Sequence, residues 1–179
     1  CKIEKIRFFK LMKALVYTGV QQLIYREEKN PKETEGESII KVEASGICGS
    51  DMHAYHGNDE RRNPPLILGH EVSGQIQKGT YKDKSVVLNP LISCSECNYC
   101  LNGNEHLCPE RSMVGMSKPF QREGGLADYI SIPDINIHEI PKNLDIREAA
   151  LTEPTAVAVH AVKLGEKNKK KPLSGCRIL

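Results

Sequence analysis

The chain has 179 residues, of which 39% are hydrophobic and 27% charged, and its formal net charge is +2. This composition is typical of a folded protein with one large domain, and the weak net charge does not favour a nucleic-acid partner. No apolar stretch approaches the ~18 residues that a membrane-spanning helix needs, and the N-terminus has no continuous apolar segment of the signal-peptide kind. We therefore expect no membrane insertion and a location in the reducing cytoplasm.

The two ends of the chain differ from the rest. Residues 1–11 precede Met12 and do not begin with methionine, so they are expected to be extraneous to the natural protein. At the other end, residues 175–179 begin an apolar run of the kind that opens a buried parallel strand. The chain then stops, which indicates a truncated protein.

Between these ends, alternation of apolar and polar residues predicts a fold made mostly of β-strands. Strands are expected around residues 14–16 and 23–25, flanking a turn at Thr18 and Gly19, and then at 40–44, 72–76, 86–88, 127–132 and 137–140. Helical signals begin only at Asp145, which is expected to cap a helix over 146–151. A second helix over 155–164 is expected to end at Gly165. The basic run 167–171 lacks interleaved aromatic residues, which favours a solvated connection.

Four cysteines lie within fifteen residues, with the spacing C-x2-C-x2-C-x7-C: Cys94, Cys97, Cys100 and Cys108. Zn²⁺ is bound tetrahedrally by four thiolates at roughly 2.3 Å, and two-residue gaps let one turn direct successive sulfurs inward. A site closed by four thiolates has no open position. The pattern therefore predicts a structural zinc held by a loop lobe over residues 93–111.

Two other interpretations of these cysteines are weaker. An iron–sulfur cluster is suggested by Cys108 followed by Pro109, but the bacterial ferredoxin run has three residues in its last gap, where this chain has seven. A disulfide framework is typical of small secreted domains, and this chain is long and without a signal peptide.

A second group of metal-ligand types precedes the lobe in the sequence. Cys48 lies in a Gly-Ile-Cys-Gly-Ser-Asp segment, and His70 and Glu71 follow Gly69. A catalytic zinc needs about three protein ligands and one open position, so a thiolate, an imidazole and one carboxylate form a suitable set. Each signal alone is weak, because a single cysteine or histidine is more often structural.

Taken together, these motifs resemble the zinc-containing medium-chain alcohol and polyol dehydrogenases. The resemblance rests on Cys48-Gly-Ser-Asp51, Gly69-His-Glu-Val-Ser-Gly74 and the four-cysteine lobe, which occur in the family's order. The stretch from Glu153 to Ala161 is similar to the sorbitol dehydrogenase branch in particular.

The resemblance implies a mostly β, GroES-like catalytic domain over residues 12–153. Residues 154–179 would then be a connecting helix and the start of a nucleotide-binding domain. No Gly-x-Gly-x-x-Gly fingerprint is present, so the α/β Rossmann domain of the family would be absent beyond its first strand. We therefore expect this chain to bind zinc but to turn over no alcohol alone.

The resemblance also implies a ligand set for the catalytic zinc. Cys48 and His70 would bind it, and Glu153 lies where the polyol branch places a carboxylate, bound directly or through water. Glu71 would either enter the coordination sphere or act as a neighbouring structural carboxylate. Asp51 would hydrogen-bond to the far nitrogen of His70, although pairing with a nearby arginine or lysine would equally explain an aspartate there.

For catalysis, the resemblance implies that zinc acts as a Lewis acid on a secondary alcohol or polyol and that hydride passes to NAD or NADP. Ser50 and His53 resemble the family's proton relay, and an imidazole can accept a proton near neutral pH. An exposed histidine without a role remains an alternative for His53.

The expected assembly of the intact protein is a homodimer or homotetramer that acts on small molecules and contains two zinc ions, one catalytic and one structural. Two competing hypotheses remain. In a zinc-stabilised binding module without catalysis, Cys48 and His70 would be structural and one resistant zinc would be found. A zinc-free quinone reductase of the same superfamily is disfavoured by the presence of both ligand sets.

Overall fold

The computed structural model describes residues 11–169, and side chains through residue 167. The strands are β1 (Leu11–Gly19), β2 (Gln22–Lys29), β3 (Glu37–Gly46), β4 (Leu66–Ile67), β5 (Glu71–Lys78), β6 (Ser85–Leu88), β7 (Leu91–Ile92), β8 (Ser112–Met113), β9 (Tyr129–Pro133) and β10 (Ile137–Glu139). The α-helices are α1 (Gly49–Tyr55), α2 (Asn98–Leu101) and α3 (Thr152–Lys169), and short 3-10 turns are η1 (Glu105–Leu107), η2 (Asp134–Asn136) and η3 (Glu148–Leu151).

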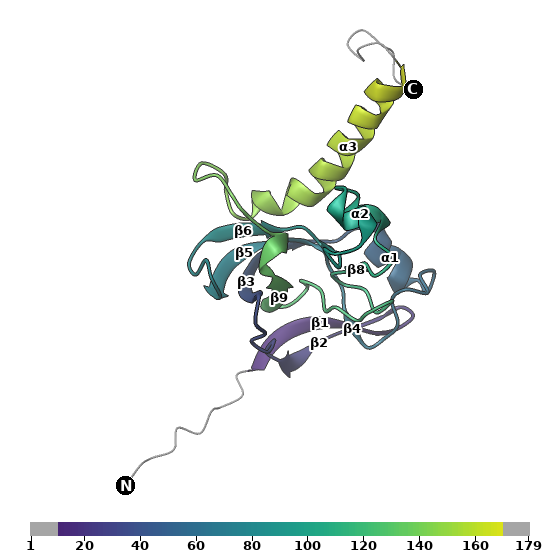
Figure 1. Ribbon diagram of the computed structural model, residues 1–179. Helices are drawn as coiled ribbons and strands as arrows, with labels where there is room; N and C mark the ends of the chain where they lie inside the picture. Colours follow the sequence, from purple (N-terminus) through teal and green to yellow (C-terminus); the bar gives the residue numbers. More distant parts are fainter. Residues whose placement is uncertain (1–10, 170–179) are drawn as a thin grey trace.

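The strands form a curled antiparallel structure, which confirms the mostly β prediction. A five-stranded sheet has the order β10-β6-β5-β3-β9, and a three-stranded sheet has the order β2-β1-β4. The segment before β9 joins them: Leu15 N donates to Leu126 O at 2.8 Å, and Val42 N donates to Asp128 O at 2.9 Å. Because one segment bonds to both sheets, they close partly around a shared interior (Figure 1).

The main core lies on the inner face of the five-stranded sheet. It contains fully or almost fully buried aliphatic side chains, namely Ile40, Val72, Ile76, Val86, Leu88, Val114, Ile130 and Ile132. β-branched residues dominate this list, as expected for strands whose side chains pack across a pleated surface. A smaller cluster packs β1 against β4, with Met12, Ala14, Val16 and Ile67.

The first hairpin turn lies later than predicted. β1 continues through Thr18 and Gly19, and the turn is made by Val20 and Gln21, whose φ of 57° is left-handed. The strand pairing explains the shift, because Tyr17 still pairs with Leu23 and the register then breaks before Gly19 pairs with Gln22.

The helices also differ from the prediction. α1 and α2 precede Asp145, so the expectation of late helices only was wrong; both are too short to show a 3.6-residue period. The expected helix over 146–151 is the shorter 3-10 turn η3, whose N-cap residue is Arg147 and has no side-chain cap hydrogen bond. Asp145, the predicted cap, lies before the turn and accepts from Arg147 N at 2.8 Å. α3 begins at Thr152 and passes through Gly165, which lacks the left-handed φ of a terminating glycine.

α3 runs outward from the sheets, and most of its side chains through residue 167 are exposed (Figure 1). No helix in the described part of the chain is long and apolar enough to cross a bilayer. The predicted final strand at 175–179, with Cys176, lies outside the described residues. So do residues 1–10 and the last two lysines of the basic run.

Candidate metal centres

The four-cysteine lobe is closed at its base by a two-stranded ribbon. Leu91 of β7 pairs with Met113 of β8, and Ile92 pairs with Ser112, so the ends of segment 93–111 are held together. Within the lobe, Ser95 adopts a left-handed φ of 63°, which turns the chain between the first two cysteines. The short helices α2 and η1 then carry the chain round to Cys108.

The four sulfurs of the lobe converge at a spacing that suits ligands of one ion. The sulfur of Cys100 lies 3.9 Å from that of Cys94 and 3.5 Å from that of Cys97, and the Cys108 sulfur lies 3.6 Å from that of Cys94. A tetrahedron with Zn–S bonds of about 2.3 Å has S–S edges of about 3.8 Å. The thiols are unpaired, which contradicts a disulfide framework. The cage is also narrower than a cluster of several iron ions needs.

Backbone amides favour the thiolate form at one of the four cysteines. Amides of Glu96 and Cys97 lower the pKa of the Cys94 thiol to about 7, against the smaller opposing effect of burial. At Cys97 the amide of Cys100 lowers the pKa, but burial and the sulfurs of Cys100 and Cys94 together raise it to about 11, so one proton is held between neighbouring sulfurs when no metal is bound. The Cys97 amide donates to the Cys94 sulfur at 3.4 Å. Since zinc binds the thiolate form, this donor set fits the metal.

The second group of ligand types is assembled by the pairing of β3 with β5. In this antiparallel pair Gly46, the last residue of β3, faces Glu71, the first residue of β5. Cys48 therefore leaves the end of β3 beside His70, which immediately precedes β5. One ligand atom from each of Cys48, His70 and Glu71 lies within 4.8 Å of the others. A thiolate, an imidazole and a carboxylate at this spacing fit zinc with one position left open.

Two glycines make this convergence possible. An ideal Cβ on Gly46 would lie 2.0 Å from a carboxylate oxygen of Glu71, so only glycine lets Glu71 occupy its position. Gly69 has a φ of 93°, and a Cβ there would lie 2.8 Å from the Leu126 side chain. Gly69 therefore directs the chain from β4 so that His70 enters the site.

Asp51 contacts both ligand-bearing segments. Its Oδ2 accepts from Cys48 N at 3.0 Å, and its Oδ1 accepts from Gly69 N at 3.4 Å. His70 Nδ1 lies 3.6 Å from Asp51 Oδ1, so the ring faces the carboxylate beyond normal hydrogen-bond distance. Because Nδ1 faces Asp51, Nε2 is the nitrogen left for a metal.

For Asp51 and His70, the attraction between opposite charges and the hydrogen bonds together shift each pKa further than burial does in the other direction. Burial alone would raise the pKa of Asp51, but His70, the Cys48 amide and Arg62 together lower it. Burial alone would lower the pKa of His70, but the Asp51 carboxylate and the Cys48 sulfur raise it. Both side chains are almost completely buried.

Glu153 lies near the second group without belonging to it. Among residues 11–169, the ligand atoms that lie within 4.8 Å of one another at this site belong to Cys48, His70 and Glu71, and Glu153 is not among them. Burial raises the pKa of Glu153, with His70 opposing the rise and Glu71 adding to it, so both are close enough to act on its charge. Glu153 also lines a hollow of about 910 Å³ between the first turns of α3, β6 and the lobe.

Ser50 and His53 lie one turn apart on α1, on the same side of the helix. The Ser50 hydroxyl oxygen accepts from Arg62 Nη2 at 3.2 Å, which leaves its proton free to be donated. His53 is exposed.

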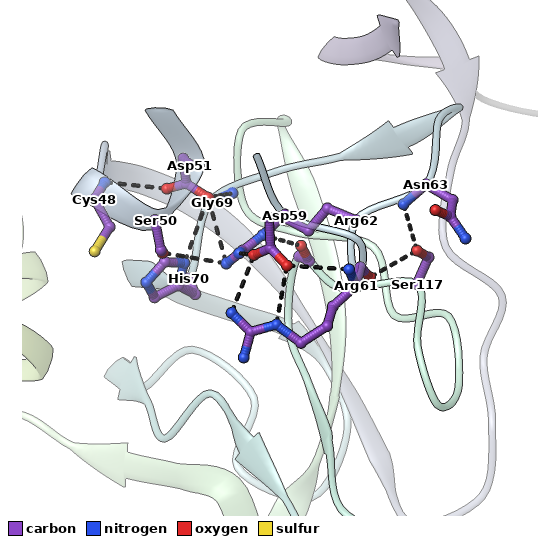
Figure 2. A network of polar contacts seen from close by, with 11 residues as sticks. Cys48, Ser50, Asp51, Asp59, Arg61, Arg62, Asn63, Gly69, His70 and Ser117 are labelled. Carbon is purple, nitrogen blue, oxygen red and sulfur yellow. Dashed lines mark hydrogen bonds and ion pairs between the residues drawn. The ribbon is translucent and has the colours of Figure 1, made fainter. Parts of the chain in front are cut away.

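Sequence patterns did not identify a buried arginine beside the site. Arg62 lies in a charged stretch, Asn58-Asp-Glu-Arg-Arg62, which is typical of a solvated turn. In the structure its side chain is 0% exposed and contacts Asp59, Asp51 and Ser50 (Figure 2). Local sequence gives no signal for this burial, because the neighbouring Arg61 has the same side chain and is 61% exposed.

Asp59 is expected to make the stability of the protein depend on acidic pH. Hydrogen bonds from Arg61 and the charge of Arg62 lower the pKa of Asp59 from its ordinary value of 3.8 to about 2, against the effect of burial. A lowered pKa in the folded state stabilises it above the unfolded pKa, and this contribution is lost as the pH falls from about 4 to about 2. We expect Asp59→Asn to lower the free energy of unfolding at pH 7 by about 1 to 2 kcal/mol.

This difference is measured by urea unfolding of both proteins at a series of pH values. The gap between parent and Asp59→Asn should close between about pH 4 and pH 2. A gap that stays constant with pH would contradict the assignment.

Comparison with known proteins identifies the domain that carries these residues. Residues 34–142 match the family model described as the alcohol dehydrogenase GroES-like domain. The chain is 35% identical over 167 residues to a sorbitol dehydrogenase of Halalkalibacterium halodurans, covering 88% of this chain and 47% of that protein.

Two solved structures have the same fold. Galactitol-1-phosphate dehydrogenase from Escherichia coli is 30% identical with a TM-score of 0.79, covering 87% of this chain and 45% of that one. A short chain alcohol dehydrogenase from E. coli CFT073, solved with NADH, is 29% identical with a TM-score of 0.79, covering 87% of this chain and 46% of that one. The chain spans less than half the length of the curated relatives that it matches. By its matched domain, its fold and its cysteine lobe, this chain belongs to the zinc-type medium-chain alcohol and polyol dehydrogenases with a GroES-like domain.

Proposed function

We propose that the full-length protein is a zinc-dependent dehydrogenase that oxidises a secondary alcohol or polyol with NAD or NADP, and that residues 12–153 form its catalytic domain. The observation that carries this proposal is the convergence of Cys48, His70 and Glu71 within 4.8 Å of one another, apart from the four-cysteine lobe. A site with three protein ligands and an open position is typical of a catalytic zinc, whereas the closed lobe is typical of a structural one.

The substrate class is inferred from the relatives. The similar proteins named above act on sorbitol and galactitol-1-phosphate, and one was solved with NADH. These are polyols or their phosphates, so the substrate is proposed to carry adjacent hydroxyl groups. Glu153, whose charge is affected by His70 and Glu71, also lines a hollow of about 910 Å³ that could receive such a chain of hydroxyls.

In this mechanism the protein holds the metal and moves a proton. Zinc, when bound, supplies a Lewis acid that lowers the pKa of the substrate hydroxyl. Asp51 holds the Cys48 amide and faces Nδ1 of His70, so the two side chains keep their spacing. Ser50 keeps a free hydroxyl proton while Arg62 bonds its oxygen, so it can pass a proton from the substrate toward His53. His53 is exposed and able to release that proton to solvent.

Two carboxylates are candidates for the third protein ligand, beside Cys48 and His70. Glu71 is the one already within reach of Cys48 and His70. Glu153 is half-buried near both His70 and Glu71, and its raised pKa reflects burial together with repulsion from Glu71. We propose that Glu71 and Glu153 exchange as the carboxylate nearest the metal, directly or through water.

The test is an assay of the full-length protein with zinc against a panel of sorbitol, arabitol, their phosphates and simple secondary alcohols, each with NAD or NADP. We expect reduction of at least one nicotinamide cofactor with a polyol, and two zinc ions per chain by elemental analysis. The control is the same protein after treatment with a chelator, which should lose the more accessible zinc together with activity. One resistant zinc and no turnover with any substrate would instead identify a zinc-stabilised binding module.

A further inference from the structure

Arg62 is a buried cation whose contacts lead to the second metal centre. Its side chain is 0% exposed, and a charge removed from water is tolerated only where partners replace the solvent. Arg62 Nε donates to Gly115 O at 3.0 Å, Nη1 donates to Asp59, and Nη2 donates to Ser50 Oγ at 3.2 Å. Each of its three nitrogens therefore has a partner, and the planar guanidinium is fixed in one orientation.

The fixed guanidinium also faces Asp51. Arg62 Nη2 lies 3.9 Å from Asp51 Oδ1, the same oxygen that accepts from Gly69 N and faces His70 Nδ1. The other oxygen of Asp51 accepts from Cys48 N. Asp51 thus contacts the backbone amide of Cys48, the backbone amide just before His70, and the His70 ring (Figure 2). The positive charge of Arg62 offsets the negative charge of the Asp51 carboxylate.

The far side of Arg62 is anchored in a separate part of the fold. Gly115 follows β8 at the base of the lobe, and the neighbouring Ser117 N donates to Arg61 O at 2.9 Å. Ser117 Oγ accepts from Asn63 N at 2.6 Å. The loop that carries Arg62 is therefore bonded to segment 115–117, and Arg62 connects this anchored loop to α1.

We propose that Arg62 is a positioning residue for the Cys48–His70–Glu71 centre, which sets the metal affinity of that centre by holding Asp51 and Ser50 in place. The inference rests on the proposed function, because it takes that centre to be a metal site. Without Arg62, Asp51 and Asp59 lose the cation that lies between them. Asp51 is then free to turn away from His70 Nδ1 and from the Cys48 amide.

Arg61 provides a matched control. It is the same residue type at the next position, and it also bonds Asp59, through Nε at 2.9 Å and Nη2 at 3.1 Å. Its side chain is 61% exposed and, among residues 11–169, bonds to Asp59 alone. A change that acts only by weakening the Asp59 loop should therefore appear equally in Arg61 and Arg62 variants.

The experiment uses the full-length protein loaded with Co²⁺ in place of zinc, in the variants Arg62→Met, Arg62→Lys and Arg61→Met. The two centres are distinguished by Cys48→Ser, which removes the signal of the second centre only. For each variant the dissociation constant of Co²⁺ at each centre and its visible absorption spectrum are measured. Mutation of a residue that hydrogen-bonds to a metal ligand typically lowers the metal affinity by about 10-fold to 100-fold.

We expect Arg62→Met to weaken Co²⁺ binding at the Cys48 centre roughly tenfold or more and to shift its spectrum, while the four-cysteine centre keeps its affinity. Arg62→Lys, which keeps the charge without the planar fork, should recover only part of the loss. Arg61→Met should resemble the parent. If Arg62→Met does not fold, the test is the Co²⁺ affinity of Arg62→Lys at the Cys48 centre, compared with that of the parent and of Arg61→Met.

The inference is overturned if Arg62 variants bind Co²⁺ at the Cys48 centre as the parent does. It is also overturned if both centres weaken in proportion, since that would show a general effect on folding. These failures differ from failure of the proposed function, in which the parent itself binds no metal that depends on Cys48.

Discussion

Replacing Cys48 with serine in the full-length protein is expected to remove one of two zinc ions per chain and to lower kcat/KM by about a thousandfold or more. The metal is expected to supply several kcal/mol of transition-state stabilisation, and each 1.4 kcal/mol corresponds to a tenfold change in rate. In the proposed three-ligand centre Cys48 would supply the thiolate, together with His70 and Glu71, whose ligand atoms lie within 4.8 Å of one another and of the Cys48 sulfur. A serine hydroxyl is a poor zinc ligand at neutral pH, so the centre would keep too few ligands to hold the ion.

The measurement combines zinc content by elemental analysis with steady-state kinetics on the best substrate of the panel. The matched control is Cys108→Ser, the same chemical change in the lobe, which should remove the other ion. A Cys48→Ser protein that keeps two zinc ions and full activity would contradict the assignment of this centre.

Replacing Cys108 with serine is expected to destabilise the protein strongly without changing its substrate preference. Within segment 93–111 the buried side chains are Cys100 and Cys108, whereas Tyr99, Leu101 and Leu107 are about half exposed or more. The lobe therefore has almost no apolar core of its own, and its order depends on the metal. Binding of a structural zinc contributes on the order of 10 kcal/mol in small domains, so loss of one ligand should cost at least about 3 kcal/mol.

Thermal unfolding with and without added zinc tests this expectation, and a loss of about 3 kcal/mol corresponds to a fall in Tm on the order of 10 °C. The ratio of kcat/KM between two polyols should remain that of the parent, because the four sulfurs form a group separate from Cys48, His70 and Glu71. The exposed residue Ser95 offers a control within the lobe, since Ser95→Gly keeps all four ligands and suits the left-handed φ of 63°. An altered preference at unchanged Tm in Cys108→Ser would contradict this division between the two centres.

The convergence of the four lobe cysteines was predictable from the sequence, because these residues are close together in the chain. Gaps of two residues limit how far successive sulfurs can separate, so the spacing from Cys94 to Cys108 already indicates a cage for one ion. The second centre was predictable only as a set of candidates. Cys48 and His70 are 22 positions apart, and their convergence depends on the pairing of β3 with β5.

The mostly β fold followed from alternation of apolar residues, but the short helices did not. α1 is stabilised by a contact between Asp51 and the Cys48 amide rather than by an apolar stripe, so periodicity does not reveal it. Gly165 is a residue type that often ends helices, but here it lies inside α3. A glycine inside a helix costs about 1 kcal/mol, which is too little to end a helix that the residues after it continue.

By itself, the sequence determined the family and the local chemistry: the thiolate cage, the residue types suited to a catalytic zinc, and the strands that carry them. Only the tertiary structure decided which carboxylate lies beside Cys48 and His70. It also decided that the side chain of Arg62 is buried between the carboxylates of Asp51 and Asp59, whose negative charges it offsets. The reason is physical. Ligand type and short spacing are properties of neighbouring residues, whereas burial and the approach of distant side chains arise only when sheets pack and exclude water.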